Sequence, residues 1–426
     1  MRAARQPVHT VYGGAHLFRS DVAQKFGKLA LAAMRRDADG DASVFAEAFG
    51  LGLDSSLAEI VRARVLAKLE REPIEDLRID FEDGFGPRRD AEEDAEASRT
   101  AAEVAAGVRA GTLPRGIGLR IKSLGPDTRA RGLRTLERFL TSFANADVSL
   151  PPGFVVTLPK ITSLEEIRML VEALANLERT LGLGERALRF EVMVETTESL
   201  IDGDGRWALP QIVRASDERL VAAHLGAYDL AASCDVAATH QTLGHPLNDF
   251  ARAAMQMCLA RTDVWLSDGA TNVLPIPVHR VDQGAPDSEE RRARILENRR
   301  AIHAAWGLHV GNIQRSLARG IYQGWDLHPA QLPARYAAVF AFFVRDAVVM
   351  GRRLLNFVER ASQATALGNI FDDAATGHGL LNFFVRAEQC GAMDDAAIME
   401  ASGLTIEELA TRSFPRLLTL RAARIA

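Results

Sequence analysis

The stretch FVVTLPKITSLEEIRMLVEALANLERTL, residues 154–181, sets the architecture that we predict for the whole chain. Its first part is a short apolar run with β-branched residues, which favours a buried strand. Its second part has apolar residues at helical spacing and starts with a capping-box pattern, either Thr162 with Glu165 or Ser163 with Glu166. A strand that ends in LPK and passes at once into a capped helix is a βα junction.

The same alternation of short apolar runs and longer amphipathic stretches extends in both directions from this junction. Eight strands are predicted, at residues 8–13, 77–82, 117–122, 154–159, 190–195, 220–227, 264–267 and 321–327. Helices between them are predicted at residues 90–109, 128–143, 163–181, 210–215 and 248–260. Eight alternating βα units predict an α/β protein with a (β/α)₈ (TIM) barrel.

Three segments depart from the alternation: residues 34–72, 271–319 and 333–426. Residues 34–72 resemble an inserted helical excursion, and residues 271–319 combine the extended run VLPIPVHRV with a charged helix. The chain has 426 residues, which fits a barrel of roughly 250–330 residues plus an appendage. We therefore predict a barrel over residues 1–332 and a C-terminal helical appendage over residues 333–426, packed on the barrel mouth or on a neighbouring subunit.

Composition narrows the classes of partner. Hydrophobic residues make up 47% of the chain and the net charge is -5, with no long basic tract, so we expect no nucleic-acid partner. No run of about 20 apolar residues and no signal-peptide pattern occurs, so we expect a cytoplasmic protein without a membrane span. The cysteines Cys234, Cys258 and Cys390 are widely spaced and predict neither disulfides nor a thiolate metal site.

The acidic run DADGDAS, residues 37–43, invites a calcium-loop interpretation. Such a loop needs Gly at its sixth position and Glu at its twelfth, but counting from Asp37 places Ala42 and Ala48 there. A solvated loop is the better interpretation.

Polar residues end five of the predicted strands, where a barrel of this class places its reacting groups. They are Asp80, Glu82 and Asp83 in RIDFEDG, Arg120 and Lys122 in GLRIKS, Lys160 in TLPK, Glu191 and Glu195 in EVMVET, and Asp229 in HLGAYDLA. Glu195 and Asp229 should project from neighbouring strand ends into one cleft, where two carboxylates repel unless a cation relieves them. A divalent ion such as Mg²⁺ or Mn²⁺ is the simplest relief, although a salt bridge at either strand end is the structural alternative.

Arg120 is the natural electrophilic partner of such a site. Its planar guanidinium can bind a carboxylate through two hydrogen bonds and stabilise developing oxyanion charge. A structural pairing with the carboxylates of residues 80–83 is the alternative.

Six segments, taken in order, resemble the HpcH/HpaI aldolase superfamily and within it the citrate lyase β-subunit and malyl-CoA lyase group. They are RIDFEDGFGPRRDAEEDA, GLRIKSLG, TLPKITSLEEI, FEVMVETTESL, LGAYDLAAS and YQGWDLHPAQL, and they span about three quarters of the chain. The chain departs from the family pattern at Lys122, where the family usually has Asn, at DFEDG, and in the two long interruptions.

The resemblance implies roles for the matching positions. Glu195 and Asp229 would be the Mg²⁺ ligands, and Arg120 would bind the substrate carboxylate and the enolate oxygen. The acidic group near the metal would comprise Asp80, Glu82 and Asp83. Tyr12, Gly13 and Gly14 match the family's first strand and glycine loop, and Tyr12, Gly13, Lys160 and His328 are expected beside the substrate, with a merely structural role as the alternative for His328.

The implied reaction is reversible carbon-carbon bond cleavage beside the carbonyl of a 2-oxo acid or an acyl-CoA, through an enolate. The base could be a water held by the cation, a carboxylate of residues 80–83, or an acid of the C-terminal region, with Asp372 and Asp373 tested first. Hydrolysis or condensation of an acyl-CoA thioester on the same site is one alternative, and a non-catalytic subunit used for assembly is another. The family resemblance also implies a homo-oligomer.

Overall fold

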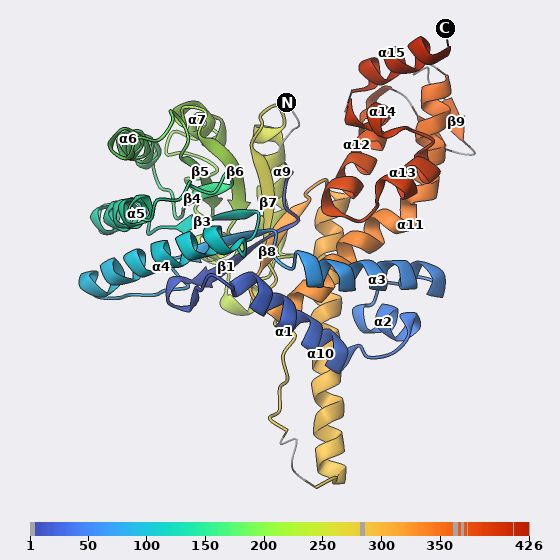
Figure 1. Ribbon diagram of the computed structural model, residues 1–426, viewed down its shortest axis with the longest axis horizontal. Coiled ribbons are helices and arrows are strands. Elements are labelled where there is room, and N and C mark those ends of the chain that lie inside the picture. Colours follow the sequence, from blue (N-terminus) through green and yellow to red (C-terminus); the bar gives the residue numbers. More distant parts are fainter. Residues whose placement is uncertain are drawn as a thin grey trace.

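The computed structural model describes residues 5–281, 286–360, 365–367, 370–372, 374–411 and 413–425. Eight parallel strands close into a barrel in sequence order (Figure 1). The strands are β1 (His9–Gly14), β2 (Asp76–Asp80), β3 (Gly116–Arg120), β4 (Phe154–Leu158), β5 (Arg189–Val194), β6 (Leu220–Leu225), β7 (Trp265–Ala270) and β8 (Gln323–Asp326). The predicted (β/α)₈ barrel is confirmed.

Most helices of the alternation lie within a few residues of their predicted positions. They are α4 (Asp90–Ala110), α5 (Arg129–Ala144), α6 (Leu164–Leu181), α7 (Leu209–Ala215) and α9 (Pro246–Leu259). The predicted capping box of α6 is only half right, because the Ser163 side chain caps no backbone N–H. Glu166 instead accepts the backbone N–H of Thr162 at 3.2 Å and its hydroxyl at 2.7 Å.

The excursion after β1 is helical, as predicted, and consists of α1 (Val22–Asp37), α2 (Ala42–Phe49) and α3 (Ser55–Arg71). Its acidic run has a structural explanation. Asp41 accepts the backbone N–H groups of Ser43 and Val44 at 2.9 and 3.1 Å and so begins α2. Asp37 pairs with Arg36 at 2.6 Å.

Between β7 and β8 lies the longest helix, α10 (Glu289–Ala318). Its first half projects beyond the barrel beside the extended segment that precedes it (Figure 1). Asn298 joins the two, because its side chain accepts the backbone N–H of His279 at 2.7 Å and donates to the carbonyl of His279 at 3.0 Å. The second half of α10 packs against α11 (Leu332–Glu359).

The C-terminal region is helical, as predicted, with α12 (Ala374–Cys390), α13 (Asp395–Ser402), α14 (Ile406–Ala410) and α15 (Phe414–Ile425) after α11. A short hairpin of β9 (Thr365–Leu367) and β10 (Ile370–Asp372) interrupts it, which the sequence analysis missed. Arg386 of α12 lies over the ring of Tyr322 with 4.8 Å between guanidinium and centroid, and Tyr322 immediately precedes β8. This contact places α12 at the amino end of β8, so packing on the barrel mouth is wrong for this chain's own barrel (Figure 1).

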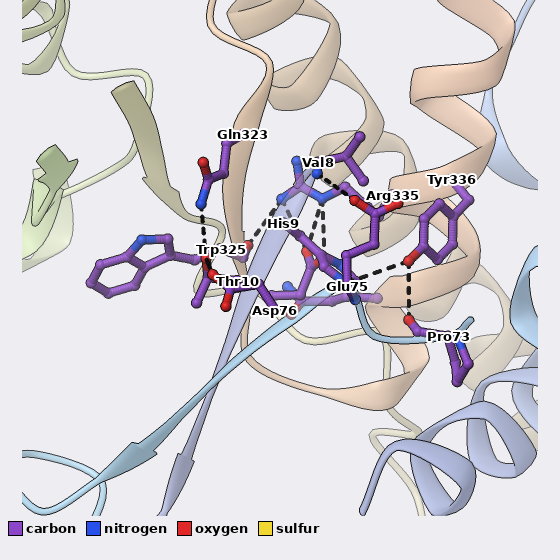
Figure 2. A network of polar contacts seen from close by, with 12 residues as sticks. Val8, His9, Thr10, Pro73, Glu75, Asp76, Gln323, Trp325, Arg335 and Tyr336 are labelled. Atoms are coloured by element: carbon purple, nitrogen blue, oxygen red, sulfur yellow. Dashed lines mark hydrogen bonds and ion pairs between the residues drawn. The ribbon is translucent and has the colours of Figure 1, made fainter. Parts of the chain in front are cut away.

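A buried polar network ties the barrel to α10 and α11 (Figure 2). Asp326 at the end of β8 is fully buried and lies 2.6 Å from Nδ1 of His9 on β1. Nε2 of His309 on α10 lies 2.9 Å from the same carboxylate, and Arg335 on α11 donates to it at 3.0 Å. Within the described residues, no helix is both long and apolar enough to cross a membrane.

Candidate functional site

Most of the polar residues predicted at the strand ends gather at the carboxyl end of the barrel, whereas Lys122 and Glu191 lie elsewhere. Arg120, the last residue of β3, is buried, and its Nε donates to Asp80 at the end of β2 at 2.8 Å. Its Nη2 contacts the second oxygen of Asp80. Its Nη1 lies 3.3 Å from Glu82 and 3.6 Å from Asp83. The edge of the guanidinium that carries Nη1 is therefore the one that faces the site.

Lys160 is the second cation of the site and lies two residues after the end of β4. Its Nζ forms a close ion pair with Glu82 and lies 3.1 Å from Asp83. Its backbone adopts φ of 49°, a left-handed conformation that costs a non-glycine residue energy and occurs where surrounding contacts enforce it. One such contact is the bond from the Lys160 backbone N–H to Glu195 at 2.7 Å.

Glu195 and Asp229 come from neighbouring βα units, as expected. Glu195 follows the last residue of β5 and is only 1% exposed. Asp229 does not end a strand, because β6 stops at Leu225 and Asp229 lies in the first turn of α8 (Ala227–Ser233). Gly226 lies in the turn between β6 and α8. A Cβ atom at this position would lie 2.4 Å from the side chain of Glu195, so only glycine fits.

The site holds more negative than positive charge. Five carboxylates surround two cations: Asp80, Glu82, Asp83, Glu195 and Asp229 face Arg120 and Lys160. Burial, reinforced by Asp229 and only partly offset by Lys160, raises the pKa of Glu195 to about 7. Burial also raises the pKa of Glu82 despite its contacts with Arg120 and Lys160. The two available cations therefore do not fully compensate the carboxylates.

A hard divalent cation fits this set of donors. Mg²⁺ prefers oxygen ligands, and one or two protein carboxylates with water and substrate oxygens complete its shell. No cluster of three or more His, Cys, Asp or Glu side chains suited to a metal occurs among the described residues. A site built on Glu195 and Asp229 would thus take its remaining ligands from outside the protein.

Below the site, the barrel interior carries a second, fully buried charge cluster. Arg78 on β2 donates through Nε and Nη2 to the two oxygens of Glu191 on β5, both at 2.8 Å. His224 on β6 lies 3.1 Å from Glu191. Burial would raise the pKa of Glu191, but Arg78 and His224 outweigh it and hold that pKa well below its usual value. Glu191 is therefore a structural anion beneath the site.

Tyr12 on β1 connects the two layers. Its hydroxyl lies 3.4 Å from Glu191, and the Arg120 guanidinium lies over its ring with 5.0 Å to the centroid. A cation above an aromatic face is attracted by the ring. Tyr12 therefore supports Arg120 from below.

Three other predicted positions, Gly13, Gly14 and His328, make no described contact with the charged residues of the site. A Cβ at Gly13 would meet no atom within 4 Å, whereas one at Gly14 would lie 2.2 Å from the carbonyl oxygen of Gly84. His328 accepts the backbone N–H of Ala330 at 3.1 Å and caps a short 3₁₀ turn. The glycine required by packing is thus Gly14, and the contact made by His328 is structural.

Lys122, the departure from the family pattern, points away from the site. Its Nζ donates to the carbonyl of Phe81 and to Glu93 on α4, both at 2.7 Å. The lysine therefore fastens β3 to α4 and adds no charge to the cluster.

A family model described as Domain of unknown function (DUF6986) matches residues 1–417. The chain belongs to that family. No curated protein sequence matches it.

Three solved structures are similar to this DUF6986 protein. A citrate lyase from Burkholderia xenovorans is 18% identical with a TM-score of 0.53, covering 80% of this chain and 92% of that one. CitE from Mycobacterium tuberculosis, solved with magnesium, acetoacetate and coenzyme A, is 16% identical with a TM-score of 0.47, covering 91% and 99%. A malate synthase from Haloferax volcanii is 16% identical with a TM-score of 0.47, covering 78% and 74%. At this identity, the Burkholderia protein shows a shared barrel fold only.

Three residues in or beneath the DUF6986 site were not singled out from the sequence. Gly226 makes room for Glu195, and Arg78 and His224 support Glu191. His224 lies on the same strand face as its interior neighbours, so alternation along β6 could have placed it inside the barrel. Gly226 belongs to the segment LGAYDLAAS that carries the family resemblance, but its close approach to Glu195 was not predicted, because that contact depends on the closed barrel.

Proposed function

We propose that this DUF6986 protein is a metal-dependent carbon-carbon lyase of the HpcH/HpaI aldolase superfamily. It would cleave or form a bond next to the carbonyl of a 2-oxo acid or an acyl-CoA through an enolate. The observation that carries the proposal is the charge balance around Glu195, where five carboxylates meet only two cations at the carboxyl end of a barrel.

In this proposal Glu195 and Asp229 hold Mg²⁺ or Mn²⁺. When bound, the cation would supply Lewis-acid polarisation of a carbonyl or carboxylate oxygen. It would also relieve the repulsion between the two carboxylates.

Arg120 would bind the substrate carboxylate and stabilise negative charge on the enolate oxygen. Asp80 occupies Nε and Nη2 of the guanidinium, so Nη1 is the edge left for a ligand. Glu82 and Asp83 now lie near that edge and would give way to the substrate anion. A fixed arginine costs little reorganisation as charge develops.

Glu82 is our choice for the base that accepts the hydroxyl proton. Among the acidic group, Asp80 is occupied by Arg120 and Asp83 is more than half exposed, with a side-chain exposure of 55%. Burial raises the pKa of Glu82, which makes it a better proton acceptor than an exposed carboxylate. Asp373 and the side chain of Asp372 lie outside the described residues, and the C-terminal helix α12 packs at the opposite end of the barrel.

Lys160 would be the second positively charged group beside the substrate. Its ammonium pairs with Glu82 and Asp83, and the negative charges of Glu195, Glu82 and Asp229 raise its pKa against the effect of burial. It would therefore remain charged during turnover and contribute a second positive charge beside the enolate.

The test uses the purified full chain with Mg²⁺ or with EDTA. A panel of 2-oxo acids, 3-hydroxy acids, aldehydes and acyl-CoA esters would be assayed for cleavage and condensation by mass spectrometry. Metal-dependent bond cleavage supports the proposal. Release of free CoA without a carbon-carbon change supports thioester hydrolysis instead, and no metal-dependent turnover of any substrate favours an assembly subunit.

A further inference from the structure

Trp325 on β8 points into the barrel, beneath the carboxyl ends of the strands. Its neighbour Asp326 points outward, where it accepts from Arg335 of α11 at 3.0 Å, and the side chains of a strand alternate between its two faces. In Figure 2 the indole of Trp325 accordingly points away from Tyr336 of α11. Trp325 therefore belongs to the interior of the barrel.

The indole packs on the ring that supports Arg120. Its centroid lies 4.4 Å from that of Tyr12, and the Arg120 guanidinium lies 5.0 Å from the Tyr12 centroid. Gly14 and Arg120 both pair with Asp80 in the layer at the carboxyl end of the strands. Because Tyr12 lies two residues before Gly14, the two rings form the layer directly beneath the site.

This layer is an apolar floor. A cluster separate from the main hydrophobic core comprises Tyr12, Met193, Ala270 and Trp325. The polar atoms of the two rings already have partners, because Nε1 of Trp325 donates to Nδ1 of His224 at 3.0 Å and the Tyr12 hydroxyl lies 3.4 Å from Glu191. A charged group placed on the floor would lose its water without gaining a partner there. The floor therefore suits a hydrocarbon group.

The apolar surface continues outward along β8. Leu327 follows Trp325 by two residues, so the alternation of an extended chain places it on the same side, and it is 39% exposed. The acidic residues of β7 and β8 turn outward instead, where Asp268 accepts from Arg252 and Asp326 from Arg335. The barrel mouth thus has a charged side on β2 to β5 and α8, and an apolar side on β7, β8 and β1.

This apolar side, named here the β8 strip, consists of Tyr12, Ala270, Trp325 and Leu327. We propose, on the basis of the proposed lyase function, that the β8 strip binds an uncharged alkyl chain of the substrate and that Trp325 limits the length of that chain. The substrate carboxylate would bind Nη1 of Arg120, and the chain would lie between the floor and Leu327. The substrate class would be 2-oxo acids with a single carboxylate and a short alkyl chain.

The charges of the site favour the same class. With a divalent cation bound, the four positive charges of the metal, Arg120 and Lys160 would face five carboxylates. A second carboxylate on the substrate would add to the negative excess, and the β8 strip carries no cation to receive it. A terminal methyl group instead gains free energy when it leaves water for an apolar surface.

The first experiment compares 2-oxopentanoate with 2-oxoglutarate, which share a five-carbon chain and differ by the terminal carboxylate. Isothermal calorimetry on the full chain with Mg²⁺ should show that 2-oxopentanoate binds at least about tenfold more tightly. Leu327→Lys places a cation on the β8 strip, so it should weaken 2-oxopentanoate and strengthen 2-oxoglutarate by about tenfold each. Ile60→Lys, on α3 with a similar exposure of 41%, is the matched control and should change neither affinity.

The second experiment tests the length limit with Trp325→Phe. The smaller ring leaves more room on the floor, so the tightest binder in the series from pyruvate to 2-oxohexanoate should become longer by one or two carbons, about a tenfold change in relative affinity. Trp265→Phe, at the amino end of β7, is the control and should leave the series unchanged. Circular dichroism checks the fold, and Leu327→Lys still decides the proposal if Trp325→Phe does not fold.

Three results would overturn the proposal: equal or tighter binding of 2-oxoglutarate by the wild type, no binding of any acid in the series, or unchanged affinities in Leu327→Lys. Failure of the lyase function would look different. The expected order of binding without carbon-carbon cleavage would contradict the lyase and keep the β8 strip. Metal-dependent cleavage of dicarboxylic substrates, unaffected by Leu327→Lys, would contradict the β8 strip alone.

Discussion

The Asp80 carboxylate accepts the Nε–H of Arg120 at 2.8 Å and the backbone N–H groups of Glu82 and Gly84 at 2.9 and 2.7 Å. One buried carboxylate thus fixes both the guanidinium and the loop that follows β2. In the proposed function, Asp80 would therefore act as a positioning residue for Arg120, and a direct role in the reaction would fall to its neighbours.

Asp80→Asn should leave Arg120 without its ionic partner and should keep only one of the two backbone hydrogen bonds to the loop, because the amide NH₂ cannot accept the other. We expect kcat to fall about a hundredfold with a smaller change in KM, because the misplaced guanidinium stabilises the transition state poorly. Steady-state kinetics on the substrate found in the panel would measure both constants. Asp127→Asn, at an exposed carboxylate, is the control. A loss confined to KM would instead show that Asp80 contributes only to ground-state binding.

Arg120→Lys keeps the charge but removes the planar fork. The lysine can satisfy either Asp80 or a substrate anion, while Arg120 presents separate edges to each. Turnover should drop by about two orders of magnitude. Arg115→Lys, on the exposed segment before β3, should behave as the wild type. Near-normal turnover in the Arg120 variant would mean that the arginine is structural.

Most strands and helices of the barrel could be predicted from local sequence patterns, because each βα unit repeats a short apolar run followed by an amphipathic stretch. FVVTLP begins β4 where predicted, and the strand ends in the other units differ by only a few residues. The same repetition predicts that Arg120 and Glu195 meet at one end of the sheet. Electrostatic contacts among Arg120, Glu195 and Asp229 agree with that expectation.

Features that depend on close approach between distant segments were not accessible from sequence. The pairing of Arg120 with Asp80 was the structural alternative predicted for that arginine, but the pairing of Lys160 with Glu82 across 78 residues of chain was not predicted. The left-handed backbone of Lys160 has no sequence signature either. The position of α12 at the amino end of β8 likewise depends on how α11 leaves the barrel. Helical periodicity specifies that a helix forms and which face is apolar, but it does not specify which neighbour it meets.

Glu195→Gln should abolish binding of Mg²⁺ while the barrel stays folded. The amide is a weaker ligand than the carboxylate, and the remaining Asp229 alone provides a single anionic donor. Isothermal calorimetry with MgCl₂ would measure binding directly, independent of turnover. Glu198→Gln, three residues further on and exposed, is the matched control. Unchanged Mg²⁺ affinity in the Glu195 variant would remove this residue from the site.

Glu195 should also make the stability of the metal-free protein depend on pH. Its pKa is raised from 4.5 to about 7. Between these pH values Glu195 is therefore mostly protonated in the folded protein but mostly ionised in the unfolded chain. Stability should therefore fall as pH rises from about 4.5 to about 7, by about 3 kcal/mol. Urea denaturation in EDTA would reveal this slope, which Glu195→Gln should lack. An identical pH dependence in the two proteins would contradict it.

Asp326→Asn should destabilise the fold without touching the site. The carboxylate is fully buried among His9, His309 and Arg335, and the charge of Arg335 would be left without its anion. Breaking a buried ion pair in this way costs about 3–5 kcal/mol. Because burial is outweighed by Arg335 and His309, the pKa of Asp326 lies well below its usual value, so this contribution is present at neutral pH and lost only in strong acid.

Urea denaturation at pH 7 would measure the free energy of unfolding of Asp326→Asn beside that of Asp204→Asn, whose carboxylate is 73% exposed. Asp204→Asn should change it by less than about 1 kcal/mol, because exposed ion pairs contribute little. Folded Asp326→Asn should bind Mg²⁺ with the same affinity as the wild type, because the Asp326 network and Glu195 are separated by the barrel wall. A stable Asp326 variant that had lost Mg²⁺ binding would show that the network controls the site.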